Sequence, residues 1–288
     1  MAVTEGRLVQ LRSGAYCDPA VPPDFQAAGR AKGRLTCISA LHHLGVFVVE
    51  HERLHVSVEP TTSRFSRPPL PHRLHRRKLV RRPEPDALCV EPLDAVYDAI
   101  RCQSPRSAVA TIDSALHLGL IDAEELDEVL GMLPHSYRML GSLVDPRAES
   151  GPETLMRLIL RSLPCVFDLQ VSIPGVGRVD FLVDEWLIVE CDSRTFHADW
   201  AAQRKDRRRD SAAAEQGLVT FRAIAEDIMW HREEVRAALA GLLASPWRRA
   251  GGGEREERAA RRRPAQLRRM GDSNPRGLSP NTLSKRAP

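Results

Sequence analysis

The sequence predicts a mixed α/β (α+β) fold, and two kinds of pattern carry that prediction. Short apolar runs rich in β-branched residues, such as 178–183 and 187–192, are typical of buried strands. Segments with apolar side chains every three or four residues, such as 92–102, are typical of amphipathic helices. A hydrophobic content of 42% over 288 residues is enough for one large or two modest domains with real cores.

Strands are expected first, at 8–17 and 53–58. In the second of these, Leu54, Val56 and Val58 alternate with polar residues, which is the pattern of a strand with one buried face. A loop rich in proline and arginine follows and runs through Pro85.

Three helices are expected next, at 92–102, 105–118 and 122–130. The apolar side chains of the first form one stripe: Leu93, Val96, Tyr97 and Ile100. Asp122 begins the third helix, where negative charge is favourable near the positive end of the helix dipole. These helices complete the expected smaller α+β domain that precedes the second domain.

The runs 178–183 and 187–192 are expected to form a hairpin whose loop length decides which side chains meet. A two-residue turn would pair Val183 with Trp186 and put Asp180 on the wrong face of the sheet. A three-residue connection, or a bulge, pairs Asp180 directly with Glu190. We therefore expect the odd-length loop.

Three carboxylates would then lie near the end of a buried strand. Asp192 shares a face with Glu190, because side chains alternate along a strand, and Asp180 lies beside them on the neighbouring strand. Buried carboxylates must bind a metal, share protons or pair with cations. Mg²⁺ or Mn²⁺ suits oxygen ligands, and deprotonated water at such a site can attack a phosphodiester.

Structural interpretations of the same residues remain open. Asp180 could simply pair with Arg178, Arg194 or Arg222. His197, which follows the second strand, could be a structural or solvated histidine.

Glu153 and the run 204–210 also have two interpretations each. Glu153 could complete the metal site, but Ser150 to Glu153 also reads as a capping box with proline in the first turn. The run 204–210 could face phosphates, or it could be a solvated helical face in which Asp206 and Asp210 pair with its arginines.

The order of these elements resembles a known nuclease family. The sequence contains Arg-Val-Asp-Phe, then Glu-x-Asp, then His; an Arg/Asp-rich helix and the strand LVTFR follow. This pattern, over residues 150–243, resembles the bacterial domain related to very-short-patch-repair endonucleases, within the PD-(D/E)xK superfamily. The resemblance implies a restriction-endonuclease-like core with the order α-β-β-β-α-β-α.

The same resemblance implies roles for individual residues. Asp180 and Glu190 would be metal ligands, Asp192 would stand where many nucleases carry lysine, and His197 would be a general acid/base or a phosphate contact. Lys205 or Arg209 would supply the cation that the motif lacks, with Arg222 as further support. The sequence departs from the pattern at Ser193, where glycine is usual, and in having no lysine within the core motif.

The N-terminal half resembles the AbiEi-like antitoxin of type IV toxin–antitoxin systems. The matching pieces are LVQLRSGAY, ISALHHLGV and VEPLDAVYDAI. Members of that family usually begin with a winged helix-turn-helix, and this sequence begins at what would be its wing. The expected domains are therefore 1–145 (a truncated winged helix with a helical region), 146–245 (the nuclease-like domain) and 246–288 (a disordered basic tail).

Charge is distributed unevenly along the chain. The formal net charge is +4, but residues 246–288 carry twelve Lys/Arg and four Asp/Glu, so the rest of the chain is net negative. Any binding of nucleic acid by the folded domains must therefore come from local basic patches. The candidate contacts are Arg73, Arg76, Arg77, Lys78, Arg204, Arg207 and Arg208.

Cysteine usage and the absence of apolar spans indicate a reduced, cytoplasmic protein. The six cysteines show no CxxC pairing, so we expect buried thiols. His51 with His55, and His72 with His75, have no neighbouring cysteines, so we expect surface histidines and no zinc site. No signal peptide or membrane span is expected.

Two functions from different classes follow. The first is a Mg²⁺- or Mn²⁺-dependent DNA endonuclease whose N-terminal domain selects the substrate or the partner. The second is a non-catalytic, antitoxin-like DNA-binding regulator that retains a nuclease fold. DNA is the expected partner in both, with a cognate toxin or a repair or defence protein as a further one.

Overall fold

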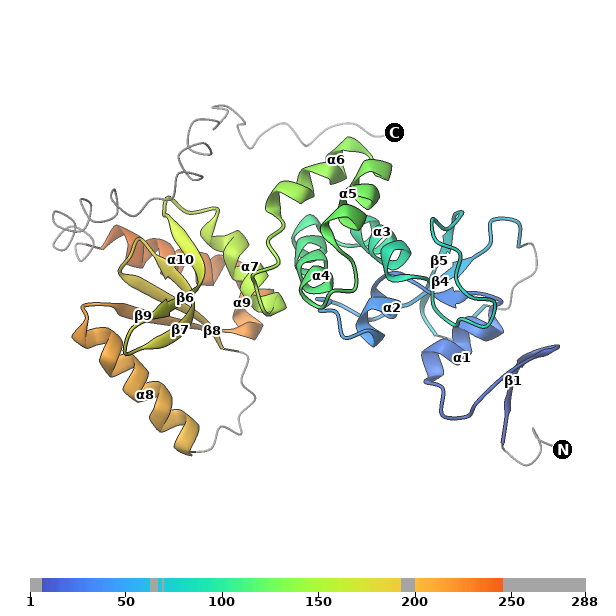
Figure 1. Cartoon of the computed structure of the whole chain (residues 1–288), viewed down its shortest axis with the longest axis horizontal. Helices are drawn as coiled ribbons and strands as arrows, with labels where there is room; N and C mark the ends of the chain where they lie inside the picture. Colours follow the sequence, from blue (N-terminus) through green and yellow to red (C-terminus); the bar gives the residue numbers. More distant parts are fainter. Residues whose placement is uncertain (1–6, 63–66, 69, 193–199, 246–288) are drawn as a thin grey trace. The chain divides into compact units, whose positions relative to one another are not determined.

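The computed structural model describes residues 7–62, 67–68, 70–192 and 200–245 (Figure 1). Within these residues the fold is mixed α/β, with three small sheets. The chain divides into two compact units, Met1–Ala240 and Gly241–Pro288, and only residues 241–245 of the second are described. No helix in the described ranges combines the length and the apolar character needed to cross a membrane. The predicted domain boundaries near 145 and 245 stay predictions.

Two small sheets lie in the first part of the chain. Their elements are β1 (Val9–Arg12), β2 (Ala15–Cys17), α1 (Pro23–Arg30), β3 (Arg34–Leu35), α2 (Cys37–His43), β4 (Leu54–Val58) and β5 (His72–Arg76). β1 and β2 form a hairpin, whereas β4 is the central strand of β3-β4-β5, antiparallel to β3 and parallel to β5.

The strand expected at 53–58 exists, but its expected half-exposed pattern is wrong. Every residue of β4 is buried, including His55 and Ser57. β4 lies between two strands and contacts α1 and α2, so neither of its faces is left to solvent. The alternation along β4 therefore reflects one apolar face and one polar face, and both faces are buried.

The helices that follow confirm the sequence prediction closely. They are α3 (Pro92–Cys102), α4 (Pro105–His117), α5 (Ala123–Met132) and the short α6 (His135–Arg138), followed by a 3₁₀ turn at Met139–Leu143. Ser104 caps α4 through its side chain, and Asp122 begins α5 in a full capping box with Glu125. Residues 27–140 contribute to one core, which α2, α3, α4 and α5 share with β4.

The second part of the chain contains a four-stranded sheet and its helices. The elements are α7 (Gly151–Leu160), β6 (Phe167–Ile173), β7 (Gly177–Val183), β8 (Leu187–Asp192), α8 (Trp200–Glu215), β9 (Val219–Ile224), α9 (Ala225–Trp230) and α10 (Arg232–Ala244). The strand order is β6-β7-β8-β9, with antiparallel pairs first and a parallel last pair. The order from α7 to β9 is the one expected from the sequence, but two helices, α9 and α10, follow β9 where one was expected.

Helices cover this sheet on both sides (Figure 1). Ala213 of α8 packs against Val176, Val179 and Ile188, which form one apolar cluster with it. α7 lies on the other side, where it contacts β8 and α9. The β8–α8–β9 crossover brings the helix back over the sheet, as parallel pairing of β8 with β9 requires.

A buried ion pair joins α4 to α7. Asp113 Oδ2 accepts hydrogen bonds from Arg157 Nη2 at 2.6 Å and from Thr154 Oγ1 at 2.8 Å. Asp113 Oδ1 accepts from the backbone N–H of Asp145 at 2.8 Å. Both charged side chains are at most 2% exposed. The carboxylate is thus satisfied on both oxygens, which is what a charge without water requires.

We expect Asp113→Asn to lower the free energy of unfolding by about 3–5 kcal/mol, because it leaves Arg157 buried without its counter-charge. Urea unfolding measures this difference. Asp168→Asn is the matched control, since its ion pair with Arg147 is exposed and should contribute about 0–1 kcal/mol. Equal losses in the two variants would contradict the importance given to the buried pair.

Candidate functional site

The β7–β8 hairpin confirms the expected three-residue loop. Val183 pairs with Leu187, and Phe181 pairs with Val189. Asp184 and Glu185 take positive φ angles of 47° and 63° in the loop. The same register places Asp180 opposite Glu190, and Asp180 Oδ2 accepts a hydrogen bond from the backbone N–H of Cys191 at 2.7 Å. Two carboxylates therefore sit side by side on neighbouring strands.

β9 adds a cation on the other flank of Glu190. Glu190 on β8 is the register partner of Arg222 on β9. Arg222 Nη2 donates to Asp210 Oδ1 at 2.6 Å, so this arginine of β9 forms an ion pair with α8. Asp210 therefore pairs with β9, whereas the solvated-face interpretation paired it within its own helix.

Arg209 on α8 supplies the cation that the core motif lacks. Its Nη2 donates to Glu190 Oε1 at 3.0 Å and to the carbonyl of Arg178 at 2.6 Å. Its Nε donates to the carbonyl of Val176 at 3.1 Å. Lys205, the other candidate cation on this helix, is exposed. Of the two, Arg209 is thus the one that the fold brings to Glu190.

Ser150 caps α7 as the sequence favoured, whereas the Glu153 carboxylate binds the N–H of Glu149 and not that of the N-cap residue. Ser150 Oγ accepts from the Glu153 N–H, and Glu153 in turn accepts from the Glu149 N–H at 2.9 Å and the Ser150 hydroxyl at 2.8 Å. Gln170 Nε2 donates to the same carboxylate at 2.7 Å. Glu153 is only 7% exposed. It closes the N-terminus of α7 and adds a third negative charge near the β7–β8 pair.

The electrostatics of these carboxylates follow from burial. Burial raises the pKa of Asp180, and the hydrogen bond from Cys191 and the charge of Arg209 act in the opposite direction. Burial and the charge of Asp180 raise the pKa of Glu190, against the lowering effect of Arg209 and Arg222. The two carboxylates therefore repel each other in a partly dry environment that two arginines only partly neutralise.

The remaining predicted residues fall in different places. Asp192 is the last residue of β8, two positions beyond Glu190, and is partly buried. His197 lies outside the described residues, as do Ser193 and Arg194. In the described chain, Asp180, Glu190 and Asp192 do not bring three ligating atoms within 4.8 Å of one another. The structure thus joins Asp180 to Glu190 and leaves Asp192 at the margin.

The first basic patch divides into exposed cations and one inward-pointing arginine. Arg77 donates to Asp98 and to Asp94, each at 2.7 Å, and its guanidinium lies over the ring of Tyr97. Arg77 is therefore held by two buried aspartates, and its expected role as a nucleic-acid contact stays a prediction. The other candidate contacts are exposed: Arg73 and Arg76 on β5, Lys78 just after it, and Arg204, Arg207 and Arg208 on α8.

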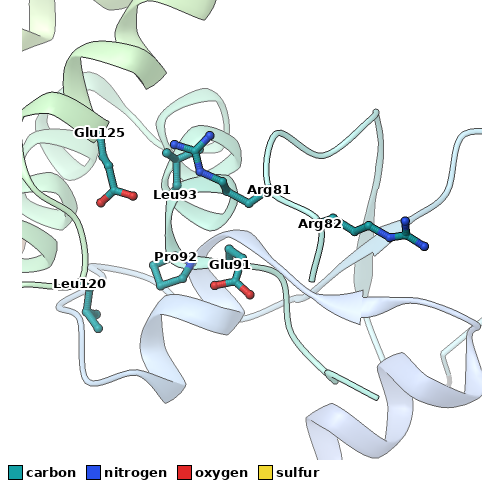
Figure 2. Close-up of a pocket in the computed structure, with 7 residues that line it drawn as sticks. All are labelled: Arg81, Arg82, Glu91, Pro92, Leu93, Leu120 and Glu125. Atoms are coloured by element: carbon teal, nitrogen blue, oxygen red, sulfur yellow. The ribbon is translucent and has the colours of Figure 1, made fainter. Parts of the chain in front are cut away.

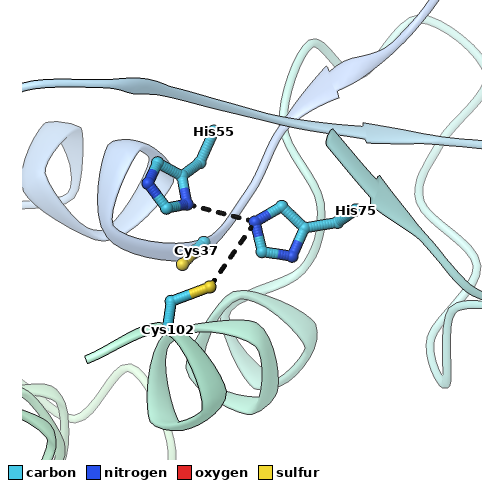
Figure 3. A group of neighbouring side chains, drawn as sticks. All are labelled: Cys37, His55, His75 and Cys102. Atoms are coloured by element: carbon cyan, nitrogen blue, oxygen red, sulfur yellow. Dashed lines mark hydrogen bonds between the residues drawn. The ribbon is translucent and has the colours of Figure 1, made fainter. Parts of the chain in front are cut away.

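A second cluster of chemically active side chains lies in the first part of the chain (Figure 3). The ligating atoms of Cys37, His55, His75 and Cys102 all lie within 4.8 Å of one another. The expectation that these histidines are surface residues without cysteine partners is wrong, since His55 is 5% exposed and the His75 side chain 9%. All six cysteines are free thiols, as expected, but only Cys37 is buried and the other five are partly exposed.

The sequence did not reveal this cluster because its members come from four elements. Cys37 begins α2, His55 lies on β4, His75 on β5, and Cys102 ends α3. None of the spacings between them matches a metal-binding motif. The one local signal is that both histidines occupy inward positions on neighbouring parallel strands, and it becomes readable only once the register is known.

A cavity of about 450 Å³ lies elsewhere, beside α3 and α5 (Figure 2). Its lining residues are Arg81, Arg82, Glu91, Pro92, Leu93, Leu120 and Glu125. Arg81 pairs with Glu128, and Glu125 belongs to the capping box of α5. Those two charged groups therefore already have structural roles.

The chain matches no protein-family model, no curated protein and no solved structure. Any function must therefore be argued from the arrangement of its side chains.

Arg209→Met should lower the free energy of unfolding by about 1.5–3 kcal/mol, because the change removes charge-assisted hydrogen bonds and leaves Glu190 without its nearest cation. Chemical denaturation gives the value. Lys205→Met removes the same charge from an exposed position of the same helix, and should change stability by less than about 0.5 kcal/mol. Equal effects would show that Arg209 does not hold the site together.

Proposed function

We propose that this protein is a metal-dependent DNA endonuclease that hydrolyses phosphodiester bonds at a site built on Asp180 and Glu190. The observation that carries the proposal is the adjacency of two partly buried carboxylates across β7 and β8, with arginines beside them. The succession helix, three strands, helix, strand, helix supports the same reading, since it is the order of a restriction-endonuclease-like core.

The donor set fits a hard divalent cation such as Mg²⁺ or Mn²⁺. Both carboxylates have raised pKa values from burial, and their mutual repulsion is the kind that a divalent cation relieves. Among the described residues, hydrogen bonds reach Oδ2 of Asp180 and Oε1 of Glu190, and none reaches their second oxygens. Oxygen ligands from two carboxylates, completed by water, are the usual environment of Mg²⁺.

The protein's own groups would divide the work around such a cation. Bound Mg²⁺ supplies positive charge to a transferring phosphate and acidifies water. Asp180 and Glu190 would hold the cation, and Asp192 would orient water from the same strand. Arg209 would place a guanidinium next to the scissile phosphate, where a planar donor stabilises developing negative charge. His197 keeps its proposed role as a general acid/base or phosphate contact.

Exposed cations on α8 would bind the DNA backbone. Arg204, Lys205, Arg207 and Arg208 are all exposed on the helix that also carries Arg209. Phosphate contacts of this kind position a duplex without reading its sequence. A duplex held along α8 would therefore have its phosphates near the carboxylate pair.

A non-catalytic DNA-binding regulator is the second candidate, and one observation favours it. Arg209 forms an ion pair with Glu190 and also donates to two backbone carbonyls, so a protein cation already stands at the carboxylate pair. In that case α8 would bind DNA while the carboxylates serve only to hold the helix on the sheet.

The deciding experiment incubates the purified chain with supercoiled plasmid, with and without Mg²⁺ or Mn²⁺. We expect metal-dependent nicking, and we expect Glu190→Gln and Asp180→Asn to reduce its rate about 100-fold or more, because each removes charge from the ligand set. Gel densitometry of nicked and linear forms measures the rate.

Glu185→Gln is the control for this experiment, since it makes the same chemical change at an exposed position of the β7–β8 loop. It should nick like the parent. Nicking that survives in Glu190→Gln would point to a contaminating nuclease, whereas DNA binding without nicking in the parent would favour the regulator.

Metal binding can be checked apart from catalysis. Saturating Mn²⁺ or Mg²⁺, at about 100 times its dissociation constant, should stabilise the parent by about 2.7 kcal/mol. Asp180→Asn should lose this shift while remaining folded, because the amide oxygen can still accept the hydrogen bond from Cys191. A thermal melt with and without metal provides the comparison, and an unchanged shift in the variant would exclude Asp180 as a ligand.

A further inference from the structure

The four side chains around His75 have the spacing of ligands on a single ion. The Nε2 atom of His75 lies 3.1 Å from Nδ1 of His55 and 3.8 Å from Sγ of Cys102. Ligands of tetrahedral zinc, at the usual Zn–N and Zn–S bond lengths, lie about 3.3–3.8 Å apart. The two measured distances thus need adjustments of only a few tenths of an ångström.

The outer contacts of His75 fix which ring nitrogen faces the cluster. Its Nδ1 lies 3.5 Å from Oδ1 of Asp98, while its Nε2 points toward His55 and Cys102 (Figure 3). A carboxylate on the far nitrogen of a histidine is the usual support of a metal-binding imidazole. Asp98 is itself held by Thr36 Oγ1 at 2.6 Å and by Arg77. Thr36 immediately precedes Cys37, so one carboxylate helps to position two members of the cluster.

The backbone at Cys37 is also held in an uncommon conformation. Its φ angle is 56°, in the left-handed region that non-glycine residues rarely adopt, and the residue is fully buried. Cys37 is the first residue of α2, and its thiol lies in the same group as that of Cys102 at the end of α3. An outlier of this kind is a reason to look for a functional constraint.

The chemical composition of the cluster selects the kind of ion. Two thiolates and two neutral imidazoles match the two positive charges of a zinc ion, and soft sulfur ligands disfavour Mg²⁺ and Ca²⁺. Four protein ligands leave no open coordination position, which is the mark of a structural site. Cys37 and His55 are buried, which suits a site that is closed to substrate.

We propose that Cys37, His55, His75 and Cys102 bind one zinc ion that clamps α2, β4, β5 and α3 together. Binding displaces the thiol protons of both cysteines to solvent, so zinc and two thiolates replace the buried thiol of Cys37 and the partly exposed thiol of Cys102. The site is separate from the carboxylate pair of β7 and β8, and it stands or falls independently of the proposed nuclease activity.

The first test uses the unaltered full chain, so no variant has to fold. Purified under reducing conditions with added zinc and then dialysed, the protein should retain about one zinc ion per chain by elemental analysis. Replacement by Co²⁺ should give the strong visible absorption of tetrahedral cobalt and a near-ultraviolet charge-transfer band from thiolate. Retention of no metal, or an octahedral cobalt spectrum, would overturn the proposal.

Variants then assign the ligands. Cys102→Ser should lose about half of the thiolate-to-cobalt charge-transfer intensity, because one of two sulfur ligands is removed. His75→Gln should weaken zinc affinity at least 10–100-fold in a competition titration with a chromogenic chelator, since loss of an outer contact alone costs that much. Cys89→Ser is the matched control, because Cys89 packs against the same core without joining the cluster; it should behave like the parent.

The main rival is a disulfide between Cys37 and Cys102. Intact-mass measurement of the native chain separates the two ideas: a mass lower by two hydrogens in the presence of zinc would show the disulfide and contradict the metal site. With zinc bound, we expect the reduced mass and thiols that react with an alkylating reagent only after a chelator is added.

Discussion

Much of the first part of this protein depends on how two buried aspartates are neutralised. Asp94 and Asp98 on α3 are at most 3% exposed, and Arg77 donates to both of them. Burial by itself raises the pKa of Asp98, but contacts with His75 and Arg77 lower it, so the group stays ionised. The hydrogen bonds of Arg77 thus hold the segment after β5 against α3. Asp98 also accepts a hydrogen bond from Thr36, which precedes α2. Loss of that one cation would remove the ion pair of Asp94 and leave Asp98 with His75 as its charged partner.

The parts of the fold that sequence could predict are those governed by local periodicity. The bounds of α3 and α4 followed from apolar spacing and from the proline at each helix start. The hairpin register followed because a side-chain period of two leaves only odd loops able to bring Asp180 to Glu190. The sequence therefore predicted the acidic part of the candidate site, a pair of carboxylates on neighbouring strands.

The features that the sequence did not predict depend on packing between segments that are distant along the chain. That Arg209, and not Lys205, reaches Glu190 is decided by how α8 lies on the sheet, which periodicity does not specify. The same limit hid the cysteine and histidine cluster, whose members span residues 37 to 102. The sequence predicts a surface position for His55 because no cysteine lies near it along the chain, whereas β4 is buried along its whole length. Polar residues that form hydrogen bonds with one another inside the protein give the same sequence pattern as polar residues that face solvent.

The parallel pairing of β8 with β9 has a consequence for the order of folding. The β7–β8 hairpin closes through a loop of three residues, an event of roughly microseconds. β9 can join only after α8 has crossed over the sheet, and non-local pairing of this kind forms more slowly. The acidic side chains of the hairpin would therefore meet before Arg209 and Arg222 arrive to balance them. Added salt should accelerate the early phase of refolding, because counter-ions screen that transient repulsion.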